Sequence, residues 1–329
     1  MRKINALIFS FLFAFVLQNK AQVQDSIYDP KSFFNLGLLG ILCTNGEYTN
    51  ETMNNLSISP IHSMVGYIKG LSIAPFNHVS HNLVGLQIGL INSVNKEVRG
   101  VQIGFTNGTT VMNGLQIGGI NFSEEKLSGV QIGFANIKKK GGMQIGALNI
   151  ADHNNCPIGI VNIIKDGDMN AGMTMDEMSL LITNFRSGGR YLYGIAGVGY
   201  SFASSLNQVA FEGGLGAHLH ISDRFRIDTE IAATHLTKVY AYFGDPEEVE
   251  ERTKDYDFKT AYRLSLRLFP SVRIGKHIEL FGGPTINYLQ SQCMENEKIF
   301  PSHYMWRKFT STSLKQIHLG WIAGIQYKI

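Results

Sequence analysis

Between residues 70 and 162 the chain repeats a short pattern of alternating apolar and polar positions. The copy at 85–92 reads Gly-Leu-Gln-Ile-Gly-Leu-Ile-Asn, so Leu86 and Ile88 fall on one face of an extended strand and Gln87 on the other. Five close copies and two degenerate ones begin at residues 70, 85, 100, 114, 129, 142 and 155. We expect each copy to form one β-strand that ends at its asparagine, because asparagine readily adopts turn conformations.

The repeat period of 13 to 15 residues is compatible with two architectures. A transmembrane strand of about 9–11 residues with a turn of about 3–5 has this period, so the copies could be successive antiparallel strands of a barrel. Alternatively, each copy could be one coil of a parallel β-solenoid whose asparagines form a ladder. The pattern within the repeats leaves both open, with a slight preference for the solenoid.

From about residue 179 the strands become longer, and one face of each strand carries charges. Along 262–273, Leu264 and Leu266 alternate with Arg263 and Arg267. A soluble sandwich would turn the charged face to water, whereas a membrane barrel turns it to a polar lumen and the apolar face to lipid. Short turns alternate with long polar loops in this part of the chain, which is typical of outer-membrane barrels.

Counting predicted strands gives two before the repeats, seven within them and seven after them. The sequence therefore predicts an all-β protein, an antiparallel transmembrane β-barrel of about 16 strands. The alternative is a repeat β-solenoid followed by a barrel of about 8 strands. The predicted segments are a signal peptide (1–21), N-terminal strands (22–69), seven strand repeats (70–163), a connector loop (164–178) and the C-terminal hairpins of the barrel (179–329).

The first 21 residues have the pattern of a secretory signal peptide. Two basic residues precede an apolar run at 6–17, and the small Ala21 follows it. Removing this segment removes three of the 29 basic residues and none of the 26 acidic ones, which leaves 26 of each. A neutral chain without a basic block argues against a nucleic-acid partner. We expect an outer-membrane location, with lipid as a partner and an unknown external ligand.

The last strand ends the chain with apolar side chains on one face, among them Leu319, Trp321 and Ile325. This ending resembles the C-terminal strand of Gram-negative outer-membrane β-barrel proteins, but it stops at Ile329, where those proteins usually have an aromatic residue. The repeats resemble bacterial surface-repeat proteins built from Gly-Leu-Gln-Ile-Gly units. The barrel resemblance implies handling by the barrel-insertion machinery, and neither resemblance implies a reaction.

A candidate calcium loop lies in the predicted connector. Asp166, Asp168, Asn170 and Glu177 place oxygen ligands at positions 1, 3, 5 and 12 of a calcium-loop spacing. The match departs from the usual loop at Ala171, where a turn-forming glycine is expected. A solvated connector is the competing interpretation, and we expect no other cofactor.

The polar face of the C-terminal strands predicts a network of charges in a lumen. Pairing across the short turn at 222–224 places His218 opposite Asp228. Charged residues on the same faces include Glu230, Arg263, Arg267 and Arg273. Buried charges need partners, so we expect these groups to fill a narrow barrel rather than line a pore. A His–Asp pair is also part of a catalytic dyad, but no nucleophile can be assigned beside it.

The sequence analysis thus predicts a non-enzymatic outer-membrane barrel protein that acts as a passive, porin-like channel, a scaffold or an adhesin. The alternative is a secreted repeat binding module, a solenoid that presents rows of glutamine and asparagine to a polymer or a partner protein. We assign no catalytic residues and no cofactor-binding residues.

Overall fold

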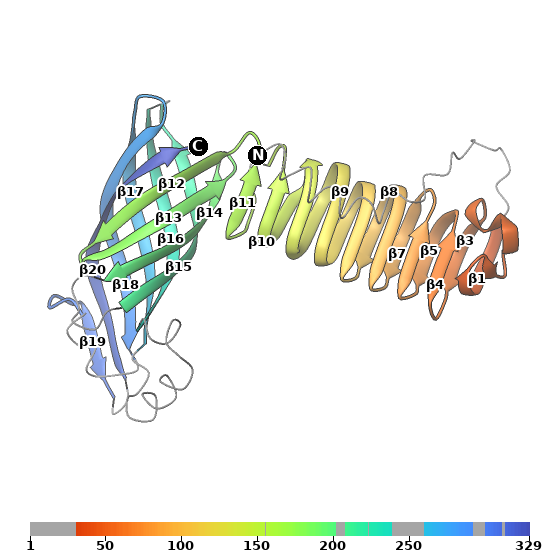
Figure 1. Ribbon diagram of the computed structural model, residues 1–329, viewed down its shortest axis with the longest axis horizontal. Helices are drawn as coiled ribbons and strands as arrows, with labels where there is room; N and C mark the ends of the chain where they lie inside the picture. The colour runs from red at the N-terminus through yellow and green to blue at the C-terminus, as the bar shows by residue number, and fades with distance from the viewer. Residues whose placement is uncertain are drawn as a thin grey trace. The chain divides into compact units, whose positions relative to one another are not determined.

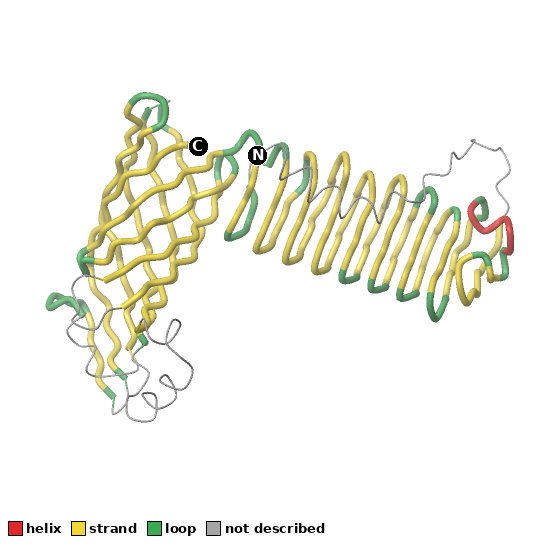
Figure 2. Tube along the Cα trace, viewed as in Figure 1, coloured by secondary structure: helices red, strands yellow, loops and turns green. Residues whose placement is uncertain are grey.

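The computed structural model describes residues 31–154, 156–201, 208–222, 224–238, 260–291, 300–310 and 313–329, so the predicted signal peptide lies outside the described residues. Strands dominate the described chain (Figure 2), and a short 3-10 helix, η1 (Gly46–Asn50), interrupts them. The chain divides into two compact units, residues 1–133 and 134–329. No helix in the described ranges combines the length and the hydropathy needed to span a bilayer.

The repeats form a parallel β-solenoid (Figure 1). Its strands are β1 (Lys31–Gly40), β2 (Leu42–Cys43), β3 (Met53–Ile58), β4 (His62–Val65), β5 (Tyr67–Ile73), β6 (Phe76–Val79), β7 (Leu83–Ile88), β8 (Ile91–Ile103), β9 (Thr106–Lys140), β10 (Met143–Ala151) and β11 (Val161–Ile164). In the first unit β3, β5 and β7 stack in parallel, and β4 and β6 form a second parallel row. The prediction of antiparallel barrel strands across the repeats is therefore wrong, and the solenoid alternative is correct.

The repeat copies at 70–77, 85–92 and 100–107 each hold parts of two strands rather than one. In the copy at 85–92, β7 ends at Ile88, the chain turns a corner at Gly89 and Leu90, and Asn92 lies inside β8. Asn92 pairs in register with Asn77 and with Asn107 of the neighbouring coils. The prediction that asparagine ends each strand is therefore wrong, because this amide points into the coil and bonds to its neighbours.

The glycine that begins each copy allows the coils to stack closely. Gly85 and Gly100 have φ angles of 136° and 144°, a conformation that side chains disfavour. A Cβ atom on Gly100 would lie 1.9 Å from the carbonyl oxygen of Gly85 in the coil before it. The same backbone contact recurs at Gly70, Gly114 and Gly129, which explains why glycine opens these copies.

Eight strands of the described chain close into an antiparallel barrel, and β12 pairs with β20 to complete the ring. The barrel strands are β12 (Asp168–Asp176), β13 (Leu180–Gly188), β14 (Leu192–Ser201), β15 (Gln208–His220), β16 (Phe225–Lys238), β17 (Ala261–Ile274), β18 (Ile278–Ser291) and β20 (Leu314–Lys328). β19 (Trp306–Phe309) pairs with the start of β20. The first barrel strand occupies the segment predicted to be a connector loop.

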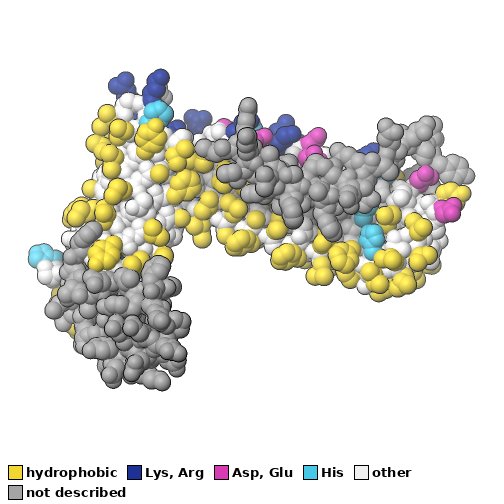
Figure 3. Space-filling view, in the orientation of Figure 1, with side chains coloured by type: hydrophobic (Ala, Val, Ile, Leu, Met, Phe, Trp, Pro, Cys, Tyr) yellow, Lys and Arg dark blue, Asp and Glu magenta, His cyan; other side chains and the backbone are white. Residues whose placement is uncertain are grey.

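The barrel wall has an apolar outer face and a charged inner face. Leu264 and Leu266 are 51% and 49% exposed, whereas Arg263 and Arg267 on the same strand are buried. The alternation along 262–273 therefore separates the two faces as the sequence predicts. Apolar side chains lie over much of the barrel surface seen in Figure 3.

Candidate functional site

The barrel lumen holds a dense group of buried charges. These side chains come from five of the eight described barrel strands, and each is at most 5% exposed: Arg186, Glu212, His218, Arg226, Asp228, Glu230, Arg263, Arg267 and Glu279. Charges buried in this way are stable only when they are paired and hydrogen-bonded. The ion pairs of this group therefore decide whether the lumen is open or filled.

Glu230 of β16 lies at the centre of the group. Its carboxylate accepts hydrogen bonds from Arg186 Nε at 2.7 Å and from Arg267 Nη1 at 3.2 Å. The hydroxyl of Tyr193 donates to the same carboxylate at 2.8 Å. Arg267 also donates to Glu212, which accepts a further hydrogen bond from Thr234. These contacts connect strands β13 to β17 across the lumen.

A second cluster surrounds Asp228, nearer to the short turns. His218 Nδ1 lies 2.6 Å from Asp228 Oδ1, in the register that the turn at 222–224 predicts. Arg226 Nε lies 3.1 Å from Asp228 Oδ2 and 3.0 Å from Glu279 Oε1. Ser271 also donates to Asp228, so His218 and Ser271 both bond to the carboxylate. In the Ser-His-Asp triad of a hydrolase the serine bonds to the histidine, whereas here Ser271 bonds to the aspartate.

The predicted lumen residues thus come together in part. His218, Asp228, Glu230, Arg263 and Arg267 all enter paired clusters, and Arg263 donates to Asp176 at the end of β12. Arg273 lies nearer the mouth of the barrel, where its Nε atom has no hydrogen-bond partner among the residues the structure describes. The sequence analysis missed Arg186. Its position is indicated by the alternation along 180–188, which puts Ile182, Asn184 and Arg186 on the same face of the strand.

The predicted calcium ligands are not brought together. β12 is extended from Asp168 to Asp176, so at roughly 3.3 Å per residue Asp166 and Glu177 lie on the order of 30 Å apart. Asp166 lies 2.6 Å from His153, whereas Asp168 pairs with Lys328 and Arg226. Glu177 accepts a hydrogen bond from Asn287 at 2.9 Å, and Asn170 is buried in the barrel wall.

The prediction of a calcium loop at 166–177 is wrong. Oxygen-bearing side chains at alternate positions also occur in a strand with one face toward a polar lumen, and β12 is such a strand. In the part of the chain that the structure covers, no group of three or more His, Cys, Asp or Glu side chains could hold a metal ion.

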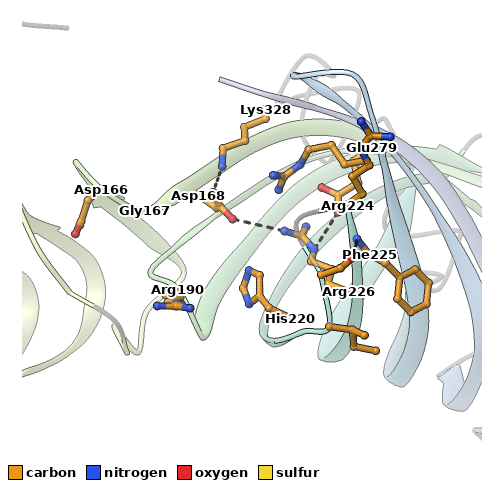
Figure 4. Close-up of a pocket in the computed structure, with 13 residues that line it drawn as sticks. Asp166, Gly167, Asp168, Arg190, His220, Arg224, Phe225, Arg226, Glu279 and Lys328 are labelled. Carbon is orange, nitrogen blue, oxygen red and sulfur yellow. Dashed lines mark hydrogen bonds and ion pairs between the residues drawn. The ribbon is translucent and has the colours of Figure 1, made fainter.

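The short-turn end of the lumen opens into a pocket of about 690 Å³ (Figure 4). Its basic lining residues are Arg190, Arg224, Arg226, Arg273 and Lys328, and its acidic ones are Asp166, Asp168 and Glu279. Arg226 and Lys328 both point to Asp168, as the dashed lines in Figure 4 show. The pocket leads inward to the ion pairs around Asp228.

An apolar cluster lies toward the opposite end of the described barrel strands. Its buried members are Met178, Leu180, Ile182, Ala210, Leu236, Ala261, Leu289, Phe300 and Leu314. Most of them lie at strand ends next to the long loops, and Phe300 comes from the segment between β18 and β20. A smaller apolar cluster in the barrel consists of Phe269, Phe281 and Ile322. It packs beside Arg186, whose guanidinium lies 4.8 Å from the Phe281 ring centre. The described lumen therefore has a pocket at one end and buried, paired side chains beyond it.

The interior of the solenoid is polar at the corners of its coils. Gln102 Nε2 donates to Gln87 Oε1 at 2.8 Å, and Gln116 continues this row. Asn92 donates to Asn107 at 2.8 Å and to the carbonyl of Ile103 at 2.8 Å. Gln87 and Asn92 are at most 1% exposed. The prediction that these rows face a ligand is therefore wrong, because the amides bond to each other inside the coil.

The second unit contains equivalent asparagine rows that end on the barrel. Asn149 donates to Asn162 at 2.8 Å, and Asn162 donates in turn to the carbonyl of Ser187 on β13 at 3.0 Å. The Ser187 hydroxyl accepts a further bond from the Asn162 backbone at 2.9 Å. The barrel strand thus supplies the partners that a next coil would otherwise provide.

Two histidines lie on the outward face of the second row of solenoid strands. Met64 and His78 are in register, and His62 precedes Met64 by two positions on β4. Burial and the neighbouring His62 lower the pKa of His78 to about 4, and burial lowers the pKa of His62 as well. Both side chains are therefore predominantly neutral at pH 7.

Comparisons of this chain with protein-family models, curated proteins and solved structures found no match. The geometry alone therefore defines the class of protein, a β-solenoid joined to a filled eight-stranded β-barrel.

Proposed function

We propose that this protein is a repeat binding module held in a bacterial outer membrane by its barrel. The barrel is the anchor, and the solenoid is the part that binds. The carrying observation is the outer face of the barrel, where large apolar side chains are half-exposed or more while the charges are inside. Leu219, Ile231 and Leu319 are 63%, 58% and 62% exposed. A soluble protein rarely exposes a continuous apolar surface of this kind, whereas lipid covers one.

The filled lumen favours an anchor over a passive channel. Conduction needs a continuous polar path, but ion pairs cross the middle of the described lumen and an apolar cluster lies toward one end. Solenoids display long, regular surfaces on which a partner can dock. Binding therefore belongs to the solenoid.

Insertion is tested on the full chain purified in detergent and reconstituted into phosphatidylcholine vesicles. We expect it to float with the vesicles after a carbonate wash. We also expect its electrophoretic mobility to change on boiling, as the closed barrel unfolds. Full-length protein that stays in the aqueous phase without detergent, with the same mobility before and after boiling, would refute the anchor.

The lumen is tested by electrical recording across planar bilayers that contain the inserted protein. We expect no ohmic conductance steps above those of protein-free bilayers. Reproducible steps at the single-protein level would instead support a passive channel.

A further inference from the structure

The first unit exposes a row of apolar side chains at the corners of its coils, which we call the apolar edge. It consists of Ile58, Ile61, Ile73, Phe76, Ile88, Leu90, Ile103, Phe105, Ile117 and Ile132. The isoleucines of the first strand row stack in register, since Ile73 pairs with Ile88 and Ile88 with Ile103. With about 4.8 Å between neighbouring coils, the row from Ile58 to Ile132 is roughly 24 Å long.

The largest side chains of this edge point away from the protein. Phe105 is 66% exposed and Leu90 is 59% exposed. The Phe105 ring lies over the corner of the next coil, where a Cβ atom on Gly119 would come within 2.9 Å of it. The amides of Gln102 and Asn107, which flank this corner, are completely buried. At this edge the coil therefore has its amides inside and its large apolar groups outside, the reverse of the usual arrangement in a soluble protein.

Charges are kept away from the apolar edge. Within residues 58–133, all of them described, the acidic and basic residues are Lys69, Lys96, Glu97, Arg99, Glu124, Glu125 and Lys126. They lie in strands β5, β8 and β9, at least four residues along the chain from the nearest residue of the apolar edge. Figure 3 shows apolar side chains along one edge of the solenoid and charged ones along the other. His62 and His78, near the apolar edge, add little charge at neutral pH because burial lowers the pKa of each.

We propose that the apolar edge of the first unit lies in the hydrocarbon region of a lipid bilayer. This inference rests on the proposed anchoring of the barrel. The ten residues of the edge are aliphatic or aromatic and carry no side-chain hydrogen-bond donor or acceptor, although His62 and Thr106 occupy the register position of Phe76 in two other coils. A specific protein interface needs such groups and a shaped surface to set its register. Acyl chains need neither.

The second unit supplies a direct argument for lipid as the occupant. The corner of its last coil, at Gly159 and Ile160, packs against the outer wall of β14. A Cβ atom on Gly194 would lie 2.0 Å from the carbonyl oxygen of Gly159 and 2.3 Å from that of Ile160. Gly194 faces outward, because its neighbour Tyr193 points into the lumen. Ile160 is 48% exposed. A corner of the same repeat row thus adjoins the wall that the proposed function places in lipid.

The test uses the full chain in vesicles that contain phosphatidylcholine brominated on its acyl chains, which quenches nearby tryptophan fluorescence. One variant combines Phe105→Trp with Trp306→Phe and Trp321→Phe. Its matched control carries Glu125→Trp, at the charged end of a neighbouring coil, in the same background. A third protein carries only Trp306→Phe, so that Trp321 on the outer wall reports the barrel. Far-UV circular dichroism and boiling-dependent mobility confirm that each variant folds.

We expect the Phe105→Trp fluorescence to be quenched several-fold more strongly than that of Glu125→Trp, with emission at shorter wavelength. If Trp321 is quenched but Phe105→Trp is quenched no more than the control, the barrel is inserted and the apolar edge is not in lipid. That result overturns the present inference and leaves the proposed function standing. If Trp321 is not quenched either, both proposals are wrong.

A second copy of the chain is the other occupant that can be tested directly. Cys43, Cys156 and Cys293 are replaced by alanine, and Phe105→Cys is introduced into the full chain in unbrominated vesicles. Lipid at the edge predicts a monomer after mild oxidation. A disulfide-linked dimer formed in high yield would show that the edge pairs with another solenoid, and would overturn the proposal.

Discussion

Asn92, one of the inward asparagines of the solenoid, makes three side-chain hydrogen bonds. Asn92 donates to Asn107 and to the carbonyl of Ile103, and accepts from Asn77 at 2.9 Å. A buried amide without partners costs about 1–3 kcal/mol, and the repeated spacing of asparagine places a partner for Asn92 in each neighbouring coil. The neighbouring glycines meet a steric demand, because the backbones of successive coils touch at those positions.

Replacing Gly100 by alanine should destabilise the solenoid by more than about 2 kcal/mol, because φ is 144° there and the new methyl group would overlap the carbonyl of Gly85. Gly108→Ala in the next strand row is the matched control, since its Cβ atom would lie 3.9 Å from the nearest atom. Hydrogen exchange of backbone amides in peptides covering 85–130 measures the difference. Equal protection in the two variants would contradict the close-stacking role of Gly100.

His78 should make the solenoid less stable in acid. Below pH 6.5 the unfolded chain gains a proton at this side chain, whereas burial keeps the folded form neutral down to its pKa of about 4. The free energy of unfolding therefore falls as the pH drops from 7 to 4, by up to about 3 kcal/mol.

The pH effect of His78 is measured by amide hydrogen exchange of the solenoid at pH 7 and pH 4. His78→Gln should lose much of the pH dependence, and the exposed His303→Gln should keep it. An unchanged pH dependence in His78→Gln would assign the effect to other groups.

At the scale of elements, the barrel strands are held together by charges that have lost their water. Arg267 on β17 bonds to Glu212 on β15 and to Glu230 on β16, and Arg186 on β13 also bonds to Glu230. Taking charges out of water costs several kcal/mol for each ion, so these pairs contribute to stability only as complete sets. Removing one partner therefore costs more than the pair itself contributes.

Arg267→Met should destabilise the barrel by about 3–5 kcal/mol, because Glu212 loses its ion pair and Glu230 loses one of two arginines. The double variant Arg267→Met with Glu212→Gln should recover part of the loss, since one unpaired charge is removed with its partner. The temperature at which the folded electrophoretic form disappears in detergent measures both. A double variant less stable than the single one would contradict the pairing argument.

At the scale of the whole molecule, both units bury polar side chains and expose large apolar ones. Inside the first unit, amide rows lie beside an apolar core that includes Val94, Val98 and Met112, and ion pairs fill the barrel. Large apolar side chains lie on the outside of the barrel and along the apolar edge of the first unit. In water such surfaces favour association, whereas lipid stabilises them. The molecule as proposed is therefore stable as a single chain only at a membrane.

Leu266→Arg should weaken membrane insertion by about 2–4 kcal/mol if Leu266 lies near the middle of the bilayer, because a charge on the lipid face is costly there. Leu266→Phe is the control that keeps the side chain apolar. Partitioning between vesicles and urea solution, followed by Trp321 fluorescence, measures the difference. Equal partitioning of the two variants would show that Leu266 does not face hydrocarbon.

Several features of the fold and the site follow from local sequence. Alternation along 262–273 predicts which side chains share a face, because successive strand residues point in opposite directions. The short turn at 222–224 predicts that His218 faces Asp228, because a tight turn sets the register of the strands that it joins. Arg186 and Tyr193 were missed as partners of Glu230, because their contacts cross the lumen between strands that are not neighbours.

The sequence by itself determined that the chain is made of β-strands, where the repeats begin, and which residues alternate along each strand. Only the tertiary structure decided that the repeats run parallel, that the glutamines and asparagines point inward, and that the barrel has eight strands instead of sixteen. Alternation with a period of two is the same in parallel and antiparallel sheets. The direction of a strand and the choice of its inner face depend on hydrogen-bonding neighbours that only the folded chain brings together.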